Sequence, residues 1–298
     1  MLRFRLSWLA TGIAIVLQGS ASPAETARAT KVFCWKATSA TTEVYLMGSI
    51  HLGKEDFYPL AKEIEDGFDK AKYLVVEADE GKMDPGKLQA MVLQRGMYAE
   101  GDALGNHVSK EMMKNVGELC ERLGLPQVAV ERMKPWLLSL TASVMSVQKA
   151  GYSPALGVDR HFLGQAKEKS KEVLELESAE FQINLISGFA EDVQAKFLAS
   201  TLEEAANVQE RMTAMVKAWS SGDAAALEKE MARRPETAAF QEKLIDERNV
   251  TMAKKIGGYL NTKDIHFVVV GAAHLIGEKG IVKLLAKDGF KVEQLEKP

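Results

Sequence analysis

A four-residue pattern, Gly-x-x-His, occurs near both ends of the chain, as Gly48-Ser-Ile-His51 and as Gly271-Ala-Ala-His274. Each copy follows a short apolar run rich in β-branched residues, which predicts a buried strand. A glycine at the carboxyl end of a strand lets the chain turn, and it places the histidine in the following loop. Because ligands bind at this edge of open α/β sheets, we expect both histidines at one site. The alternative is that neighbouring backbone groups satisfy two purely structural histidines.

Glu77 is the third candidate, because this carboxylate closes the apolar run of the predicted buried strand 73–77. A parallel strand ending there brings Glu77 to the same sheet edge as His51 and His274. Two histidines and one carboxylate with open coordination positions suit a catalytic divalent metal. Without a metal, histidine and glutamate can still act as a general base on water. The alternative for Glu77 is a loop or helix-start carboxylate in solvent.

The first 24 residues have the pattern of a secretory signal peptide. Arg3 and Arg5 precede the apolar stretch 6–17, and small residues offer cleavage sites after Ala21 or Ala24. We therefore expect a mature domain at 25–298 that is periplasmic or secreted; an uncleaved N-terminal anchor is the alternative. No later segment approaches eighteen apolar residues, so we expect no integral membrane segment after signal removal.

Charge and cysteine content narrow the possible partners. Without Arg3 and Arg5 the chain has 36 basic and 41 acidic residues, a net charge of −5. This balance gives no reason to expect nucleic acid or an anionic membrane as a partner. Cys34 and Cys120 can pair in an oxidising compartment, or remain buried free thiols. The oligomeric state stays open.

The remaining pattern predicts an α/β fold with a central, mostly parallel sheet, helices on both faces and a large helical cover. Strands 32–36 and 43–47 are expected to form a hairpin, and the order strand, helix 58–72, strand predicts a parallel pair with a right-handed crossover. Helical insertions are expected at about 84–156 and 179–260. The other predicted elements are helices 109–123, 136–150, 157–169 and 277–288 and strands 172–176, 264–270 and 290–295.

Further residues are candidates for the site, and each has a simpler interpretation. Glu177 ends a strand directly before a helix, where the helix dipole alone favours an acid. Arg248 can fold over the sheet edge and stabilise an oxyanion, with Asn249 beside it, although such an arginine usually lies on a solvated helix face. Asp159 is most simply a helix N-cap, and His161 in the same turn can line the site. His107 and His266 are interpreted as structural.

Seven motifs, in order, resemble the TraB/GumN family, which is related to the Tiki metalloproteases and to the wider erythromycin-esterase and ChaN-like fold. The resemblance covers about residues 31–296. The matching segments are Trp35, 44–51, Val75-Val-Glu77, Gly157-Val-Asp159, Leu176-Glu177 with Gln182, Glu247-Arg248-Asn249 and 269–275.

The resemblance to Tiki implies peptide hydrolysis with a divalent metal, Mn²⁺ or Co²⁺ in preference to Zn²⁺. It implies His51, Glu77 and His274 as the residues that hold the metal or activate water, with Arg248 at the site. From this resemblance we expect a metal-dependent hydrolase acting on a peptide or protein. No G-x-S-x-G or H-E-x-x-H motif occurs, which argues against a serine esterase and a zincin. The alternative is a non-catalytic, ligand-binding or regulatory protein that sequesters a peptide, haem or a metal; haem is suggested by relatives of the fold.

Overall fold

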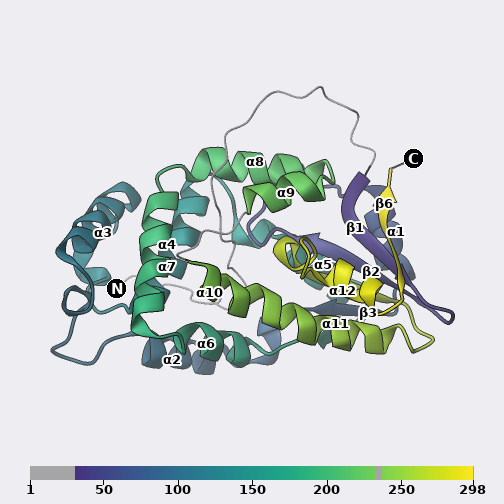
Figure 1. The fold of residues 1–298 in the computed structure, drawn as a ribbon, viewed down its shortest axis with the longest axis horizontal. Helices are drawn as coiled ribbons and strands as arrows, with labels where there is room; N and C mark the ends of the chain where they lie inside the picture. The colour runs from purple at the N-terminus through teal and green to yellow at the C-terminus, as the bar shows by residue number, and fades with distance from the viewer. Residues whose placement is uncertain (1–30, 232–236, 298) are drawn as a thin grey trace.

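The computed structural model describes residues 31–231 and 237–297, so the predicted signal peptide lies outside the described residues. Its centre is a six-stranded sheet with strand order β4-β3-β5-β2-β1-β6 (Figure 1). The strands are β1 Lys31–Thr38, β2 Glu43–Ser49, β3 Tyr73–Val76, β4 Glu172–Glu175, β5 His266–Gly271 and β6 Lys291–Glu296. The strands β2, β5, β3 and β4 are mutually parallel, while β1 is antiparallel to both β2 and β6. The predicted hairpin and the mostly parallel sheet are confirmed.

The predicted adjacency of the second and third strands is wrong, because β5 lies between β2 and β3 and pairs with both. Every residue of β5 is buried. A strand that is apolar on both faces is stable only with a strand on each side and with cover above and below. The last third of the chain therefore returns to the middle of the sheet and separates two strands that are consecutive in sequence.

Helices make up the rest of the described chain. They are α1 Lys62–Lys70, α2 Pro85–Gly96, α3 Lys110–Leu123, α4 Pro135–Lys149, α5 Val158–Glu168, α6 Ala179–Ser187, α7 Glu191–Glu204, α8 Val208–Ser220, α9 Ala224–Glu230, α10 Ala238–Gln241, α11 Glu247–Tyr259 and α12 Ile281–Lys287. Figure 1 shows α3, α4 and α7 at one end of the molecule and the sheet at the other. Within the described ranges, no helix combines the length and the apolar character that crossing a membrane requires.

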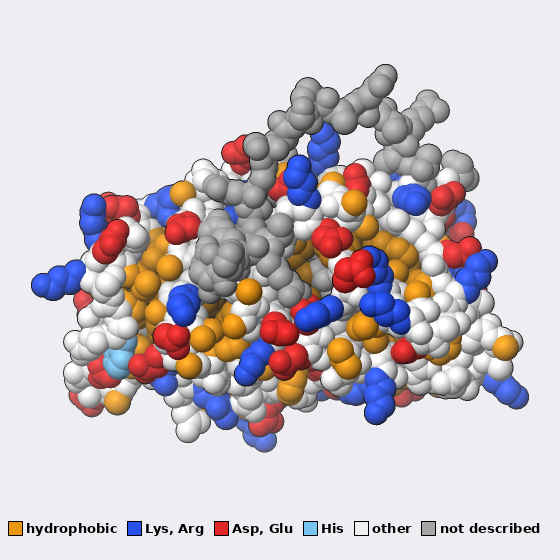
Figure 2. All heavy atoms as spheres, viewed as in Figure 1, with side chains coloured by type: hydrophobic (Ala, Val, Ile, Leu, Met, Phe, Trp, Pro, Cys, Tyr) orange, Lys and Arg blue, Asp and Glu red, His pale blue; other side chains and the backbone are white. Residues whose placement is uncertain are grey.

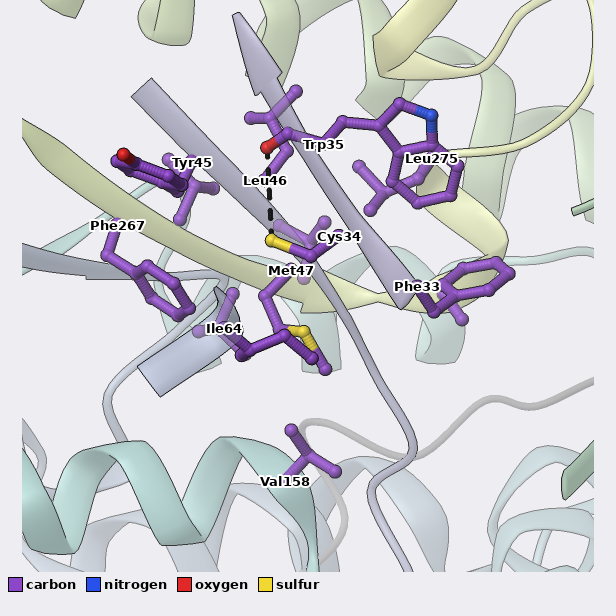
Figure 3. Close-up of a cluster of buried hydrophobic side chains, with 14 of the residues drawn as sticks. Phe33, Cys34, Trp35, Tyr45, Leu46, Met47, Ile64, Val158, Phe267 and Leu275 are labelled. Atoms are coloured by element: carbon purple, nitrogen blue, oxygen red, sulfur yellow. Dashed lines mark hydrogen bonds between the residues drawn. The ribbon is translucent and has the colours of Figure 1, made fainter. Parts of the chain in front are cut away.

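The main core lies around the sheet. On one face, Phe267 of β5 packs against Phe68 of α1 and Phe162 of α5, with ring centroids 5.5 and 4.7 Å apart. Figure 3 shows the β1 and β2 side of this core, where the buried thiol of Cys34 points to the backbone of Trp35. Cys34 and Cys120 are both buried free thiols. Two further apolar clusters hold the helical part together, so the predicted helical cover has packing of its own.

Candidate functional site

The two Gly-x-x-His segments lie side by side at one edge of the sheet. In the parallel register of β2 and β5, Ser49 is the partner of Gly271. Glu77 directly follows β3, the other neighbour of β5, and its carbonyl accepts a hydrogen bond from the Glu177 amide beyond β4 (2.7 Å). Parallel strands end at the same edge, so their next residues meet there. Four segments that are distant in sequence therefore supply the site.

Three candidate side chains converge on Gly271. A β-carbon at this position would lie 3.2 Å from Glu77 Oε1, 3.2 Å from His51 Nε2 and 3.7 Å from His274 Cδ2. The Gly271 amide also donates to Glu77 Oε1 at 2.5 Å. The first two contacts are tighter than most β-carbons show, so glycine lets the three groups approach this closely without displacement. The structure thus brings His51, Glu77 and His274 together.

Gly48 has a different role, because it lies one register position behind Gly271, opposite Val270. Successive strand residues face opposite sides of a sheet. A β-carbon on Gly48 would lie 2.5 Å from the Phe33 ring, and its carbonyl accepts a hydrogen bond from Trp219 Nε1 at 2.8 Å. The first glycine therefore allows close packing behind the site, and Ser49 takes the position that faces it.

His51 is oriented by the start of α5. Its Nδ1 lies 3.2 Å from Asp159 Oδ1, and that same oxygen accepts a hydrogen bond from Ser49 Oγ at 3.0 Å. Gly157 permits this contact, since a β-carbon there would lie 2.3 Å from the His51 carbonyl oxygen. Burial lowers the pKa of His51, but the charge and hydrogen bond of Asp159 and the charge of Glu77 outweigh it, and the net effect raises the pKa. Nε2 is left facing Gly271.

His274 is held by a neutral partner instead. Asn249 Oδ1 lies 2.6 Å from His274 Nδ1, and the Asn249 amide nitrogen donates to the Lys279 carbonyl at 2.9 Å. That second bond fixes which end of the amide faces the ring, so Nδ1 carries the proton. Nε2 lies 3.7 Å from Glu77 Oε1. Burial lowers the pKa of His274 to about 4, so the ring is neutral at pH 7.

Arg248 joins the two acidic candidates. Its Nη2 lies 2.9 Å from Glu77 Oε2 and 2.8 Å from Glu177 Oε2, while Nε lies 3.0 and 3.1 Å from the two Glu177 oxygens. Nη1 donates to the Leu244 carbonyl at 2.8 Å, in the π-helical turn Glu242–Asp246 that precedes α11. Gln182 lies 3.3 Å from both carboxylates. Arg248 is therefore buried in a charge network and does not lie on a solvated helix face.

The network keeps Glu77 ionised although it is buried. Burial alone raises the pKa of a carboxyl, but the positive charges of His274, Arg248 and His51 together with the Gly271 amide lower the pKa of Glu77 to about 2. Because His274 is neutral at pH 7, Arg248 supplies the permanent positive charge there. The pKa of Arg248 is in turn raised, since the two carboxylates outweigh its own burial.

These groups form the polar floor of a cavity of about 90 Å³. A volume of only about 10–15 Å³ is enough for one water molecule, so water has room beside the histidines. The other walls are mostly apolar and come from helices of the cover. The lining residues are Ser49, Ile50, His51, Leu52, Glu77, Val147, Gln182, Leu185, Ile186, Met212, Met215, Leu227, Met231, Leu244, Ile245, Arg248, Gly271, Ala272, Ala273 and His274.

His161 lies away from this cavity in the part of the chain that the structure describes. Its Nε2 contacts Glu65 at 3.3 Å and its ring stacks on Tyr58 at 4.5 Å. The two histidines interpreted as structural also have local partners. His107 stacks on Tyr98, and His266 lies between the rings of Tyr73 and Tyr259.

Two polar residues of the site were not predicted from the residue pattern: Ser49 and Gln182. Ser49 stands inside the first motif, and its strand parity puts it on the face of Gly271. Gln182 follows Glu177 by five residues and is the fourth residue of α6, the helix capped by Ser178. Gln182 could have been predicted as a site residue because it is polar and lies in the first turn of a helix that starts at the sheet edge.

The donor types of the site fit a divalent cation. Two imidazole Nε2 atoms and a carboxylate oxygen are ordinary ligands, and a hydrogen-bonded partner on each Nδ1 is the arrangement that orients metal-binding histidines. Glu77 Oε1, however, already accepts from the Gly271 amide. In residues 31–231 and 237–297, no three His, Cys, Asp or Glu side chains are arranged as a group that could hold a metal ion. The residues present fit the cation chemically, without a preformed cluster.

Comparison with known proteins finds a family and relatives that match most of the chain. The model of the TraB/PrgY/gumN family matches residues 33–294. "Uncharacterized protein YbaP" of Escherichia coli (strain K12) is 26% identical over 261 residues, or 85% of this chain and 93% of the relative. An "Uncharacterized protein" of Treponema pallidum (strain Nichols) is 22% identical over 269 residues, or 85% of this chain and 80% of the relative. No solved structure gives a significant match.

Proposed function

The chain belongs to the TraB/PrgY/gumN family, and from that premise and its site we propose that it is a metal-dependent hydrolase of peptide bonds. The observation that carries the proposal is the convergence of His51 Nε2, Glu77 Oε1 and His274 on Gly271. Each imidazole has its Nδ1 occupied, so each presents Nε2 to a cavity with room for water. Neither serine nor cysteine is needed as a nucleophile in such a site.

His51, His274 and Glu77 are the residues that would hold the cation. When bound, a divalent metal lowers the pKa of its water and polarises a carbonyl, which supplies a nucleophile at neutral pH. The resemblance to the Tiki proteases favours Mn²⁺ or Co²⁺ over Zn²⁺ for this role.

The chain's own residues orient and charge this centre. Asp159 and Asn249 hold the imidazoles with Nε2 toward the cavity. Arg248, with Glu177 behind it, holds Glu77 as a carboxylate. Arg248 also lines the cavity, so its charge favours negative charge developing on a bound carbonyl oxygen, as a preorganised site requires. Most of its contacts are to the protein, and we therefore assign it first a positioning role.

The experiment is peptide cleavage by the purified protein with Mn²⁺, Co²⁺, Zn²⁺ or EDTA. We expect cleavage with Mn²⁺ or Co²⁺ that EDTA abolishes and added metal restores. His51→Ala and His274→Ala should remove most of the rate, whereas His107→Ala, outside the cavity, should retain it. Cleavage that EDTA leaves unchanged, or wild-type rates in both site variants, would contradict the proposal.

We further propose that the protein acts in the periplasm or outside the cell, because the first 24 residues have a signal-peptide pattern. Intact-mass measurement of protein from the periplasmic fraction should give a chain that starts after Ala21 or Ala24. Finding only an unprocessed chain in the cytoplasm would contradict export.

One observation favours a second candidate function, sequestration of a ligand without turnover. Both Glu77 oxygens already accept hydrogen bonds from protein groups, Oε1 from Gly271 and Oε2 from Arg248. The same incubations, followed in the visible spectrum after addition of haemin, separate the two. A Soret shift without any cleavage would favour sequestration.

A further inference from the structure

The cavity is strongly divided into a polar floor and apolar walls. The floor is made by the sheet-edge residues described above. The walls come from separate parts of the helical cover: Val147 of α4, Leu185 of α6, Met212 and Met215 of α8, and Ile245 of the π-helical turn. A bound molecule that fills this space must therefore be polar at one end and apolar at the other.

The wall residues are placed to receive a ligand as well as to fill the core. Val147, Leu185 and Ile245 line the cavity and are only half-buried. Met212 and Met215 are three residues apart and so lie on the same face of α8. Apolar side chains that keep part of their surface exposed to a cavity gain free energy when an apolar group covers them.

The size of the cavity limits that group. Its volume is about 90 Å³, whereas an apolar cavity of about 150 Å³ is known to bind benzene. A branched aliphatic side chain suits the smaller space better than an aromatic ring or a long acyl chain. We propose that the walls bind an aliphatic side chain, of the size of Val or Leu, next to the carbonyl that the floor residues act on. This inference rests on the proposed hydrolase function and names its substrate class.

The test uses a set of otherwise identical peptides in which one residue beside the cleaved bond is Gly, Val, Leu, Phe, Asp or Lys. We expect kcat/KM to be at least about tenfold higher for Val and Leu than for Gly, Asp or Lys, the range that apolar pockets give for small changes. Leu185→Lys should remove most of this preference. Val128→Lys, on an exposed turn outside the cavity, is the matched control and should keep it.

A binding measurement separates this inference from the hydrolase proposal. N-acetyl-leucinamide should raise the melting temperature of the wild type and of Val128→Lys but not of Leu185→Lys, and N-acetyl-aspartamide should raise none. Ile245→Lys is the second wall variant, should Leu185→Lys fail to fold. Leucinamide binding without peptide cleavage would support this inference and contradict the hydrolase.

Three outcomes would overturn the inference. The first is cleavage at equal rates whatever the flanking residue, which would leave the hydrolase proposal standing. The second is tighter binding of an octanoyl amide than of the leucine amide, which would assign the walls to an acyl chain. Absence of stabilisation by any of these compounds would likewise overturn it.

Discussion

Replacing Arg248 by methionine is the sharpest test of the charge network. The variant keeps a long side chain of similar reach but removes every contact of the guanidinium with Glu77, Glu177 and the Leu244 carbonyl. Two buried carboxylates are then left close together, with Gln182 shared between them at 3.3 Å. Removing one partner of a buried ion pair lowers the free energy of unfolding by about 3–5 kcal/mol, because the remaining buried charge is uncompensated.

In a chain of this size that loss corresponds to a fall in melting temperature on the order of 10 °C. The assay is thermal unfolding followed by circular dichroism, beside chemical denaturation for the free energy of unfolding. Arg248→Lys retains the charge but not the planar fork, so we expect an intermediate loss, and a smaller fall in turnover than in either site-histidine variant. The double variant Arg248→Met/Glu177→Met should lose less than the sum of the single changes, because it removes one stranded carboxylate.

Arg95→Met is the matched control, since Arg95 lies exposed on α2 and its replacement should change stability by no more than about 0.5 kcal/mol. If Arg248→Met unfolds at the same temperature as Arg95→Met, the two carboxylates are not held by the guanidinium. The reasoning about the network, and with it the positioning role of Arg248, would then be refuted.

The remaining predictions concern single histidines and their partners. Asn249→Ala leaves the buried Nδ1–H of His274 without its acceptor, so it should cost about 1–3 kcal/mol in denaturant unfolding and lower the peptide-cleavage rate; an unchanged midpoint would argue against the bond. Asp159→Asn should lower the pKa of His51, measured by NMR titration of the ring, because the charge that raises it is gone; no shift would contradict the assignment. Burial lowers the pKa of His266, so the unfolded chain binds its proton first, and stability should fall as pH drops below about 6.5. His266→Phe should show a shallower fall over that window, and an identical pH profile would refute this.

The sequence predicted the sheet edge well because the two motifs and Glu77 each follow a short apolar run. The end of each strand can be predicted from neighbouring residues, and parallel strands end at the same edge of a sheet. The order of the strands depends instead on contacts between segments that are distant in sequence. The helix between β2 and β3 suggested neighbours, yet the burial of every residue of β5 shows that the third strand belongs between them. A run apolar on both faces was the available signal for a central strand.

Arg248 shows where residue patterns fail. Read along the chain, it stands among Glu247, Asp246 and Lys254, a setting typical of a solvated face. The structure buries it, and its Nη1 donates to the Leu244 carbonyl in the π-helical turn before α11. Such a turn has no sequence signature of its own, and π-helical turns are frequent at functional sites. Its oxyanion role stays a prediction, as do the assignments of Gly48 and His161 to the site lining.

Helix ends were predicted less accurately than helix positions. The helix expected at 277–288 begins only at Ile281. Gly277 has a φ of +81°, which is outside the helical region, and a β-carbon added to Gly280 would lie 2.4 Å from the Ile276 carbonyl oxygen. The helix expected at 109–123, by contrast, has the expected ends: Ser109 caps it by accepting a hydrogen bond from the Met112 amide, and it ends at Leu123. A capping side chain can be recognised from a single residue, whereas a helix that starts after a packed loop depends on the contacts of that loop.

The position of β5 also decides when this protein can work. Its residues pair with β2 on one side and β3 on the other, although both partners are made some two hundred residues earlier. Pairing between strands so distant in the chain is slow, and it cannot begin before β5 has been synthesised. A chain without β5 lacks both His274 and the strand that joins β2 to β3. Insertion of β5 thus joins the two halves of the sheet and brings His274 to the site in the same step.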